Sequence, residues 1–471
     1  MVVGIRTGRS LWLQEALADE ADAPALRGSE RADVCVVGGG YVGLWTALRI
    51  KELEPSADVA VVEADVCGGG ASGRNGGFVL TWWPKFATLA KLGGIEEARR
   101  MCRASADAVE SIGAFCREHG VDAGFHMDGY LWAATNRRQV GDWRPMIEGL
   151  ARYGERPFEE WSGEEAAART GSAVHLGGAF ERTAAVVQPA RLARGMRRVA
   201  VERGIRIFER SPMTELAGGG PGGIAVRTRD GSVRAGRAVL AMNAWGVRFR
   251  EIRRRVLVIG SDVVATAPVP ERLAQIGWTD GMSIADSRYL VHYYRTTDDG
   301  RIAFGKGGGA LAIGSRVGER FEGEAPYARE AEKALRRTYP QLSAVAITHR
   351  WTGPIDRTRS GLPVFDSLRA HPDAVYGVGF SGNGVGPSYV AGHILASMAL
   401  RRDDEWARCP LVGSRPPRWP PEPVRFVGGS LVKGALLRME RAQDDDTRPG
   451  RLDEAILRMA PTGIVPMRVR T

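Results

Sequence analysis

The spacing of apolar residues near the start of the chain predicts two buried strands joined by a helix. Residues 34–37 and 59–62 are unbroken runs of valine, cysteine and alanine, as in strands that are covered on both faces. Between them lie a glycine-rich turn and a predicted helix at about residues 42–53. A strand, a helix and a second strand of this kind form a βαβ unit, so the sequence predicts a parallel sheet.

The turn after the first strand has the spacing of a dinucleotide-binding loop. Its glycines follow the pattern G-x-G-x-x-G, and an acidic residue ends the second strand. The glycines permit a tight turn and a close approach of backbone N–H groups to a diphosphate, which the positive end of the helix attracts. The acid is placed to accept hydrogen bonds from ribose hydroxyls, which argues against a 2′-phosphate. The cofactor-binding residues predicted here are Gly38, Gly40, Tyr41, Val42, Gly43 and Glu63.

The pattern of the remaining chain predicts a second domain. Alternating apolar residues from about 253 to 301 indicate an antiparallel sheet, and Asp230-Gly231 predicts a tight hairpin. We therefore expect an α/β (α+β) fold, with a Rossmann-like cofactor domain and a second, antiparallel-sheet substrate domain. The expected helices span about residues 11–18, 95–118, 139–150, 190–203 and 389–400, and the expected strands about 129–134, 205–208, 224–229, 238–242, 256–259, 261–266, 289–295 and 374–378.

This pattern divides the chain into four parts. The first 29 residues form an N-terminal extension, and a proline-rich stretch opens a C-terminal tail that is packed on the body or partly disordered. The expected division is 1–29 for the extension, 30–85 with 180–250 and 345–405 for the cofactor-binding domain, 86–179 with 251–344 for the substrate domain, and 406–471 for the tail.

The composition adds a net charge of +10, but it does not indicate a nucleic-acid partner. The basic residues are mostly arginines spread along the whole chain, without a basic stripe interleaved with aromatic residues. No apolar run approaches the roughly 20 residues that span a bilayer, and residues 1–17 carry charges that a secretion signal lacks. The five cysteines form no C-x-x-C pair and the histidines show no metal spacing. We therefore expect reduced thiols, no metal, no membrane contact and a cytoplasmic protein.

A second glycine-rich segment narrows the choice of dinucleotide cofactor. Residues 68–77 read GGGASGRNGG, which is too polar for a core element and flexible enough to follow a flat ring, with Arg74 and Asn75 as fixed donors. This loop resembles that of the D-amino-acid-oxidase-like FAD oxidoreductases, most closely the branch containing γ-glutamylputrescine oxidase. The resemblance implies that the loop lies against the isoalloxazine. The residues it implies as FAD contacts are Ala71, Ser72, Arg74, Asn75, Gly76 and Gly77.

Three later segments, within about residues 30–400, support the same resemblance. Residues 187–207 are similar to the family's helix and strand that lead to a backbone clamp on adenine, and residues 238–245 to its strand under the cofactor. Residues 379–387 are similar to its C-terminal glycine turn, which precedes a helix whose N–H groups face the flavin N1/C2=O edge and stabilise negative charge. The implied contacts are Met213, Ala241, Asn243, Trp245, Gly353, Gly382, Asn383, Gly384 and Val385.

Two departures from the family bear on the flavin. Relatives often have histidine where Asn383 stands, which puts an imidazole role in doubt. Some relatives attach flavin through a cysteine before the C-terminal turn or a histidine near the N-terminal loop. This chain has no cysteine between Cys116 and Cys409 and no histidine before His119, so we expect non-covalent FAD.

The candidates for the substrate side are mostly aromatic, because hydride transfer to flavin requires orientation and exclusion of water more than a strong base. Each of these aromatic residues can equally belong to the core. Lys306 is a candidate catalytic residue that helps O₂ accept electrons, as a lysine does in some family members, although a surface lysine in a glycine turn explains it as well. The substrate-binding candidates are Trp82, Trp83, Tyr293, Tyr294, Arg295 and Trp351.

The resemblance implies an FAD-dependent oxidase of an amine or amino acid. Its products are an imine, then an aldehyde or keto acid with ammonia, and hydrogen peroxide from O₂. A dehydrogenase that passes electrons to a quinone or carrier protein, and a non-catalytic flavoprotein scaffold or sensor, remain as alternatives. An NAD-dependent dehydrogenase would leave the second glycine loop and the C-terminal turn unexplained. Primary amines, N-methyl amines, polyamine conjugates, amino acids and aminophosphonates all remain open as substrates, and so does the oligomeric state.

Overall fold

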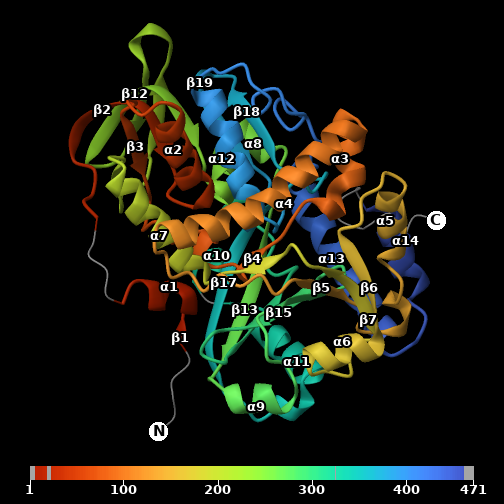
Figure 1. Ribbon diagram of the computed structural model, residues 1–471. Coiled ribbons are helices and arrows are strands. Elements are labelled where there is room, and N and C mark those ends of the chain that lie inside the picture. The colour runs from red at the N-terminus through yellow and green to blue at the C-terminus, as the bar shows by residue number, and fades with distance from the viewer. Residues whose placement is uncertain (1–5, 19–22, 324, 461–471) are drawn as a thin grey trace.

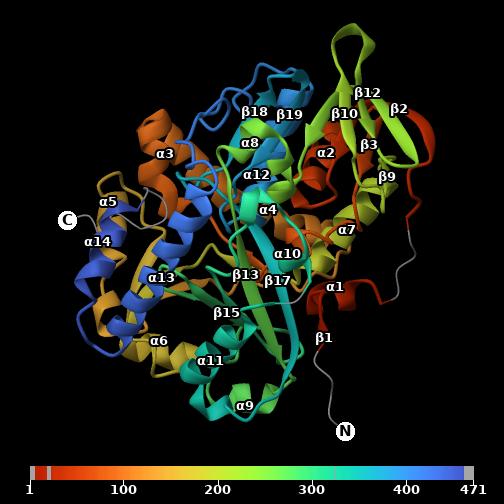
Figure 2. The same ribbon diagram turned by 180° about the vertical axis from the view of Figure 1, so that it is seen from behind.

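The computed structural model describes residues 6–18, 23–323 and 325–460, which form two large sheets joined by long connections (Figure 1). Figure 2 shows the same arrangement from behind, with the longest strands of the second sheet crossing the middle of the molecule. Among the described residues, no helix is both long enough and apolar enough to cross a membrane.

The first sheet has eight strands and contains the predicted βαβ unit. Five of its strands run parallel, in the order β9, β3, β2, β12 and β19, with β10 and β11 continuing one edge of β12 as a hairpin and β18 pairing with β19. The hairpin turn at Asp230-Gly231 is confirmed. The strand bounds are β2 Gly28–Val37, β3 Val59–Val62, β9 Arg206–Phe208, β10 Glu215–Gly218, β11 Ile224–Arg227, β12 Gly231–Leu240, β18 Val364–Leu368 and β19 His371–Val378.

Helices cover one face of this parallel sheet and bury Val34 and Val36 of β2 and Val59 and Val61 of β3. The glycine turn leads directly into the first of these helices, so its N-terminus lies at the carboxyl ends of the strands, where α/β folds bind ligands. The main helices on this side are α2 Tyr41–Leu53, α4 Ile95–Glu118, α7 Pro189–Glu202 and α12 Val385–Ala399, with α3 Phe86–Gly93 beside α4.

The second sheet has nine strands, in the order β1, β17, β13, β16, β15, β14, β5, β7, β6. Most pairs are antiparallel, as expected, but β14 pairs with β5 and β1 pairs with β17 in parallel, so the sheet is mixed. Helix α11 packs on one face over a core with Phe304 and Tyr294. The strand bounds are β1 Arg6–Thr7, β5 Tyr130–Ala133, β6 Phe158–Ser162, β7 Gly177–Glu181, β13 Leu257–Thr266, β14 Ser283–Asp286, β15 His292–Thr296, β16 Ile302–Lys306 and β17 Ile347–Arg357.

The remaining elements are short. A two-stranded sheet of β4 Phe78–Val79 and β8 Ala185–Val186 lies in the middle of the molecule, between the two larger sheets (Figure 1). The other α-helices are α1 Leu11–Ala16, α5 Arg144–Ala151, α6 Gly163–Thr170, α8 Arg250–Arg253, α9 Pro270–Gln275, α10 Glu319–Glu322, α11 Ala328–Thr338, α13 Val424–Asp444 and α14 Arg451–Met459.

Three expectations about the elements require correction. Strand β17 pairs along its whole length with β13, so it belongs to the second sheet rather than with residues 345–405 of the cofactor-binding domain. Helix α12 starts at Val385, four residues before the expected start at 389, because the glycine turn ends at Gly384. The strands expected at 256–259 and 261–266 are the single strand β13, since Gly260 continues the ladder opposite Pro354.

The C-terminal tail is folded wherever it is described. Helices α13 and α14 pack against each other, and Leu436 and Leu457 share a small core with Leu290 of the second domain. Residues 461–471 of the expected tail lie outside the described residues.

Candidate functional site

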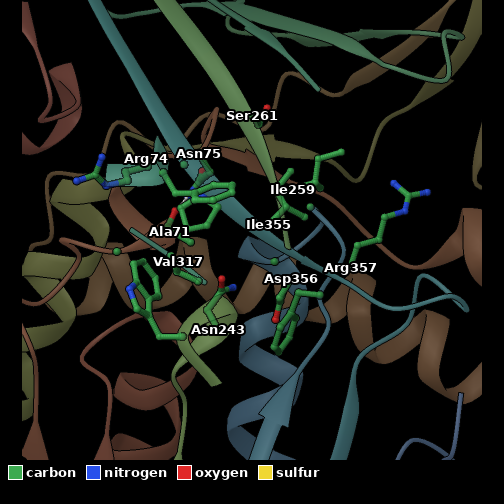
Figure 3. A pocket seen from close by; sticks show the side chains of 18 of the residues that line it. Ala71, Arg74, Asn75, Asn243, Ile259, Ser261, Val317, Ile355, Asp356 and Arg357 are labelled. Atoms are coloured by element: carbon green, nitrogen blue, oxygen red, sulfur yellow. Dashed lines mark hydrogen bonds between the residues drawn. The ribbon is translucent and has the colours of Figure 1, made fainter. Parts of the chain in front are cut away.

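A large cavity of about 1720 Å³ lies between the two sheets and is lined by residues of both. Typical small-molecule pockets measure about 300–1,000 Å³, so this cavity has room for a dinucleotide together with a further ligand. Figure 3 shows side chains of the loop around Ala71, of β13 at Ile259 and of β17 at Asp356 converging on it.

The first glycine turn is shaped for a ligand that approaches its backbone. Gly38 has a φ of 113°, which favours glycine, and a Cβ on Gly40 would stand 2.8 Å from Ser72 Oγ. A Cβ on Gly43 would stand 1.9 Å from the carbonyl oxygen of Gly38, so only glycine lets α2 pack this closely on the turn. Gly38 and Gly40 line the cavity, at the N-terminus of α2.

Glu63 ends β3 at the same edge of the sheet and lines the cavity. Its carboxylate accepts the backbone N–H of Gly39 at 2.6 Å and that of Asp65 at 2.9 Å. Burial raises the pKa of this carboxyl, and the two N–H donors oppose the rise. The carboxylate is therefore held in place by backbone groups, with lone pairs left for a hydroxyl donor.

The second glycine loop is fixed by its own polar side chains. Arg74 is buried and donates to the carbonyl oxygens of Gly69 at 3.0 Å and of Gly8 and Thr352 at 3.1 Å. Asn75 donates to the Ala71 and Ser72 carbonyls and accepts the N–H of Gly77. We expected both residues to serve as fixed donors to a ligand. Although they line the cavity, these hydrogen bonds go to the backbone and shape the loop.

The C-terminal glycine turn is held by a buried carboxyl. Asp356, at the end of β17, accepts the N–H of Gly379 at 2.6 Å, and burial raises its pKa to about 7. Asn383 donates from Nδ2 to the Thr81 carbonyl at 3.0 Å, while its buried Oδ1 has no hydrogen-bond partner within the described part of the chain. An unpaired buried acceptor on the wall of a cavity is costly unless a ligand donor pairs with it.

Comparison with known proteins places this geometry in a family. Residues 33–398 match the family model DAO, described as FAD dependent oxidoreductase. The chain belongs to the DAO family of FAD-dependent oxidoreductases. FAD is therefore its cofactor, and the cavity fits it: Gly38 and Gly40 of the first glycine turn line it, and the unpaired Oδ1 of Asn383 on its wall can accept a flavin N–H.

Two curated proteins and one solved structure illustrate what this chain is similar to. The chain is 32% identical to the gamma-glutamylputrescine oxidoreductase of Escherichia coli over 81% of its length and 86% of the relative's. It is 29% identical to a probable oxidoreductase OrdL of Haemophilus influenzae, again over 81% of this chain and 86% of the relative's. Glycine oxidase from Geobacillus kaustophilus shares the fold, with a TM-score of 0.66 at 19% identity over 82% of this chain and 99% of that one.

The structure brings together nearly all the cofactor residues predicted from the first glycine turn and from the family resemblance. Only Gly43 and Gly77 of that set are absent from the cavity lining, because both serve close backbone packing instead. The set that lines the cavity is Gly38, Gly40, Tyr41, Val42, Glu63, Ala71, Ser72, Arg74, Asn75, Gly76, Met213, Ala241, Asn243, Trp245, Gly353, Gly382, Asn383, Gly384 and Val385.

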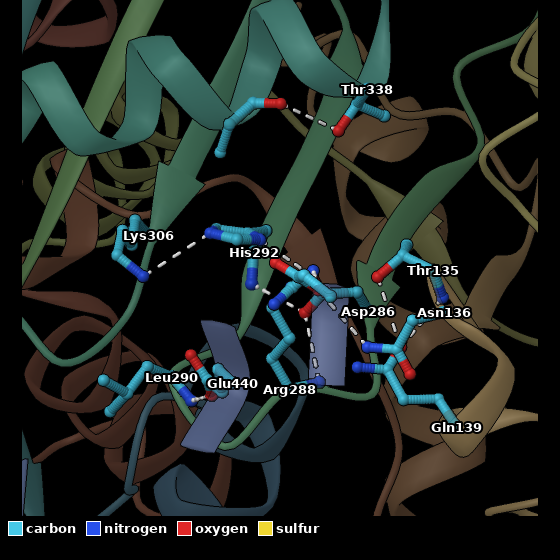
Figure 4. A network of polar contacts seen from close by, with 12 residues as sticks. Thr135, Asn136, Gln139, Asp286, Arg288, Leu290, His292, Lys306, Thr338 and Glu440 are labelled. Carbon is cyan, nitrogen blue, oxygen red and sulfur yellow. Dashed lines mark hydrogen bonds and ion pairs between the residues drawn. The ribbon is translucent and has the colours of Figure 1, made fainter. Parts of the chain in front are cut away.

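Most candidates for the substrate side lie away from the cavity, and strand alternation explains the positions of Tyr294 and Lys306. Tyr293 lines the cavity, and its hydroxyl is 2.8 Å from Ser261 Oγ. Tyr294, the next residue of β15, points to the opposite face, where it contacts His175. Lys306 pairs with His292 across β15 and β16 and lies on that opposite face too, with its Nζ 3.4 Å from His292 Nε2 (Figure 4). The expected placement of Lys306 at the flavin is therefore not supported.

The other substrate candidates pack in the core or form hydrogen bonds that support the second glycine loop. Trp82 is buried, Trp83 stacks on Phe86, and neither lines the cavity. Trp351 donates from Nε1 to the carbonyl of Arg74 at 2.8 Å. Arg295 is also buried, and it donates to the carbonyls of Gly76 and Val187.

The residues on the second-domain side of the cavity carried no sequence motif. They are aromatic and aliphatic side chains from strands and the β14–β15 loop, together with basic residues from segments far apart in the chain. This part of the lining includes Tyr130, Leu257, Ile259, Tyr289, Leu290, Val291, Arg253, Arg316, Arg320, Arg357 and Lys433. The apolar alternation of β13 is a local signal for two of them, since Leu257 and Ile259 are two residues apart and share one face.

Proposed function

We propose that this FAD-dependent oxidoreductase oxidises the carbon–nitrogen bond of an amine or amino acid. The observation that carries the proposal is the cavity, which continues beyond the two glycine loops to a wall with Tyr130, Tyr289 and Tyr293. The names of two relatives, gamma-glutamylputrescine oxidoreductase and glycine oxidase, support an amine or amino-acid substrate.

The chemistry needs orientation and a dry site. Bound FAD would supply a two-electron acceptor for the hydride that leaves the carbon next to nitrogen. The substrate becomes an imine, which water hydrolyses to an aldehyde or keto acid and ammonia. Tyr293 presents an un-ionised phenol, because burial raises its pKa to about 12. It can therefore orient a substrate through its ring and hydroxyl but does not act as a base.

The cofactor contacts that we propose follow the cavity lining. Glu63 would accept hydroxyls of the adenosine ribose, the N-terminus of α2 would face the diphosphate, and Asn383 Oδ1 would pair with a flavin N–H. The positive N-terminal end of α12 at Val385 favours negative charge on the reduced ring. We further propose that FAD is held without a covalent bond, that O₂ accepts the electrons to give hydrogen peroxide, and that the enzyme works in the cytoplasm.

The test is the visible spectrum of the purified protein under anaerobic conditions, before and after addition of a panel of amines and amino acids. We expect oxidised-flavin bands that bleach with one class of amine, and hydrogen peroxide when air is admitted. Bleaching without peroxide would replace the oxidase by a dehydrogenase that uses a quinone or carrier protein. Flavin bands that no amine bleaches would favour a scaffold or sensor, and would overturn the proposed reaction.

A further inference from the structure

Helix α13 reaches the cavity although it lies outside the part of the chain that the family model matches. The match covers residues 33–398, whereas α13 spans Val424–Asp444. Three residues on one side of this helix, Gly429, Lys433 and Leu436, line the cavity. Their spacing of four and three residues places them on a single helical face. The wall that they form is therefore an addition of this chain to the matched fold.

We propose that α13 selects the substrate, and that Lys433 on it binds a carboxylate carried by the amine. This inference rests on the proposed amine oxidation, because it names the substrate of the same cavity.

Lys433 lines the cavity, and two neighbours orient its ammonium group. Its Nζ donates to the Gly309 carbonyl at 2.6 Å and lies 3.8 Å from the centre of the Tyr327 ring. Both contacts orient the group, and an ammonium has three N–H donors, so further donors remain for a ligand. Burial lowers its pKa to about 8 against the opposing effect of the Asp262 carboxylate, and a bound carboxylate would restore the charged form.

The charge of the cavity also favours an anionic ligand. Its lining has more basic than acidic side chains: the basic ones are Arg74, Arg248, Arg253, Arg316, Arg320, Arg357 and Lys433, and the acidic ones are Glu63, Asp65 and Asp356. The diphosphate of FAD carries two negative charges, which do not balance this excess. A substrate with a carboxylate would reduce the repulsion that remains, whereas a purely cationic amine would add to it.

Polar contacts fix α13 about two and three turns beyond Lys433, and Figure 4 shows the contact between Glu440 and Leu290. Asp444 forms ion pairs with Arg288 at 2.5 Å and with Arg337 at 2.6 Å. Glu440 accepts the N–H of Leu290 at 2.9 Å, and Leu290 is itself part of the cavity wall. The helix and the β14–β15 loop are thereby joined into one surface, so the position of Lys433 does not depend on a flexible tail.

The experiment compares Lys433→Met with a matched control, Arg441→Met, which removes a cation from an exposed position of the same helix. Anaerobic flavin reduction is followed with 5-aminopentanoate and with pentylamine, which differ in a carboxylate. We expect Lys433→Met to raise the half-saturating concentration of 5-aminopentanoate about tenfold or more, as for loss of one charged hydrogen bond. Pentylamine and the control variant should change little. Equal changes for both amines, or none, would overturn the role of Lys433.

A second readout separates this inference from the proposed reaction. Calorimetry measures the binding of glutarate to the FAD-loaded wild type, to Lys433→Met and to Lys433→Arg. We expect binding that Lys433→Met weakens about tenfold and Lys433→Arg largely keeps, since arginine also pairs with carboxylates. If no amine reduces the wild-type flavin while glutarate binding follows this order, the reaction fails and the anion site stands. If the affinity for glutarate is the same in the wild type and in both variants of residue 433, the proposed anion site is wrong, whatever the amine data show.

Discussion

Glu181, at the end of β7, is expected to contribute to the pH dependence of the free energy of unfolding. It is buried beside Thr81, whose hydroxyl donates to it at 2.5 Å, and burial raises its pKa from 4.5 to about 7. A folded-state pKa above the unfolded value stabilises the protein below the unfolded pKa, and this contribution is lost as the pH rises through the folded pKa. A pKa rise of this size corresponds to a loss of about 3 kcal/mol in the free energy of unfolding between pH 5 and pH 8.

The change that tests this is Glu181→Gln, which keeps the shape and the acceptor oxygen but removes the titration. We expect the wild type to lose about 3 kcal/mol more of its free energy of unfolding between pH 5 and pH 8 than the variant does. Urea unfolding of the FAD-loaded protein, followed by far-UV circular dichroism at both values, measures the difference. Glu118→Gln, at an exposed end of α4, is the matched control. A Glu181→Gln variant with the wild-type pH dependence would refute the reasoning.

The same substitution is expected to leave the flavin site unchanged. Thr81 connects Glu181 to the cavity, because its carbonyl accepts Asn383 Nδ2 at 3.0 Å. Glu181 contacts the Thr81 hydroxyl and not its carbonyl, so its protonation leaves the contact with Asn383 in place. We therefore expect the flavin spectrum to stay the same in Glu181→Gln, which distinguishes a change in stability from a change in the cofactor site.

Three further predictions concern the cofactor and the buried lysine. Gly40→Val places its side chain against Ser72 Oγ, 2.8 Å from the position of a Cβ, and should yield a folded but colourless protein on purification; a yellow variant would contradict the placement of the diphosphate. Asn383→Leu removes the unpaired acceptor and should weaken FAD binding by about 1–3 kcal/mol in a fluorescence titration. An unchanged affinity for FAD would show that Asn383 Oδ1 does not pair with the flavin. Lys306→Met should leave reoxidation of the reduced flavin by air unchanged in stopped-flow, since Lys306 contacts His292 on the far face of β16; slower reoxidation would return it to the flavin.

The cofactor half of the site could be predicted because its chemistry is local in sequence. Gly38, Gly40 and Glu63 sit in one βαβ unit, where spacing alone fixes their relation to the strand ends. The loop at 68–77 is equally compact, although the sequence could not tell that Arg74 and Asn75 direct hydrogen bonds to the backbone. That distinction depends on the Gly8 and Thr352 carbonyls, which come from distant segments.

The substrate half could not be predicted, for two physical reasons. In a strand, neighbouring residues face opposite sides, and without the register of β15 the pair Tyr293-Tyr294 cannot be resolved into one cavity residue and one core residue. Lys433 reaches the cavity only because α13 packs on the β14–β15 loop, a contact between residues about 150 apart in the chain. No local pattern encodes such a contact.

The N-terminal segment before the first strand of the parallel sheet supports the flavin loop from outside. Ser10 Oγ donates to the Gly73 carbonyl at 2.5 Å, and Trp12 Nε1 donates to that of Asn75 at 2.9 Å. These props precede residue 33, where the family match begins. Flavin colour is thus an optical reporter on Ser10 and Trp12, and a change at either residue is expected to reach the flavin through the loop that it contacts.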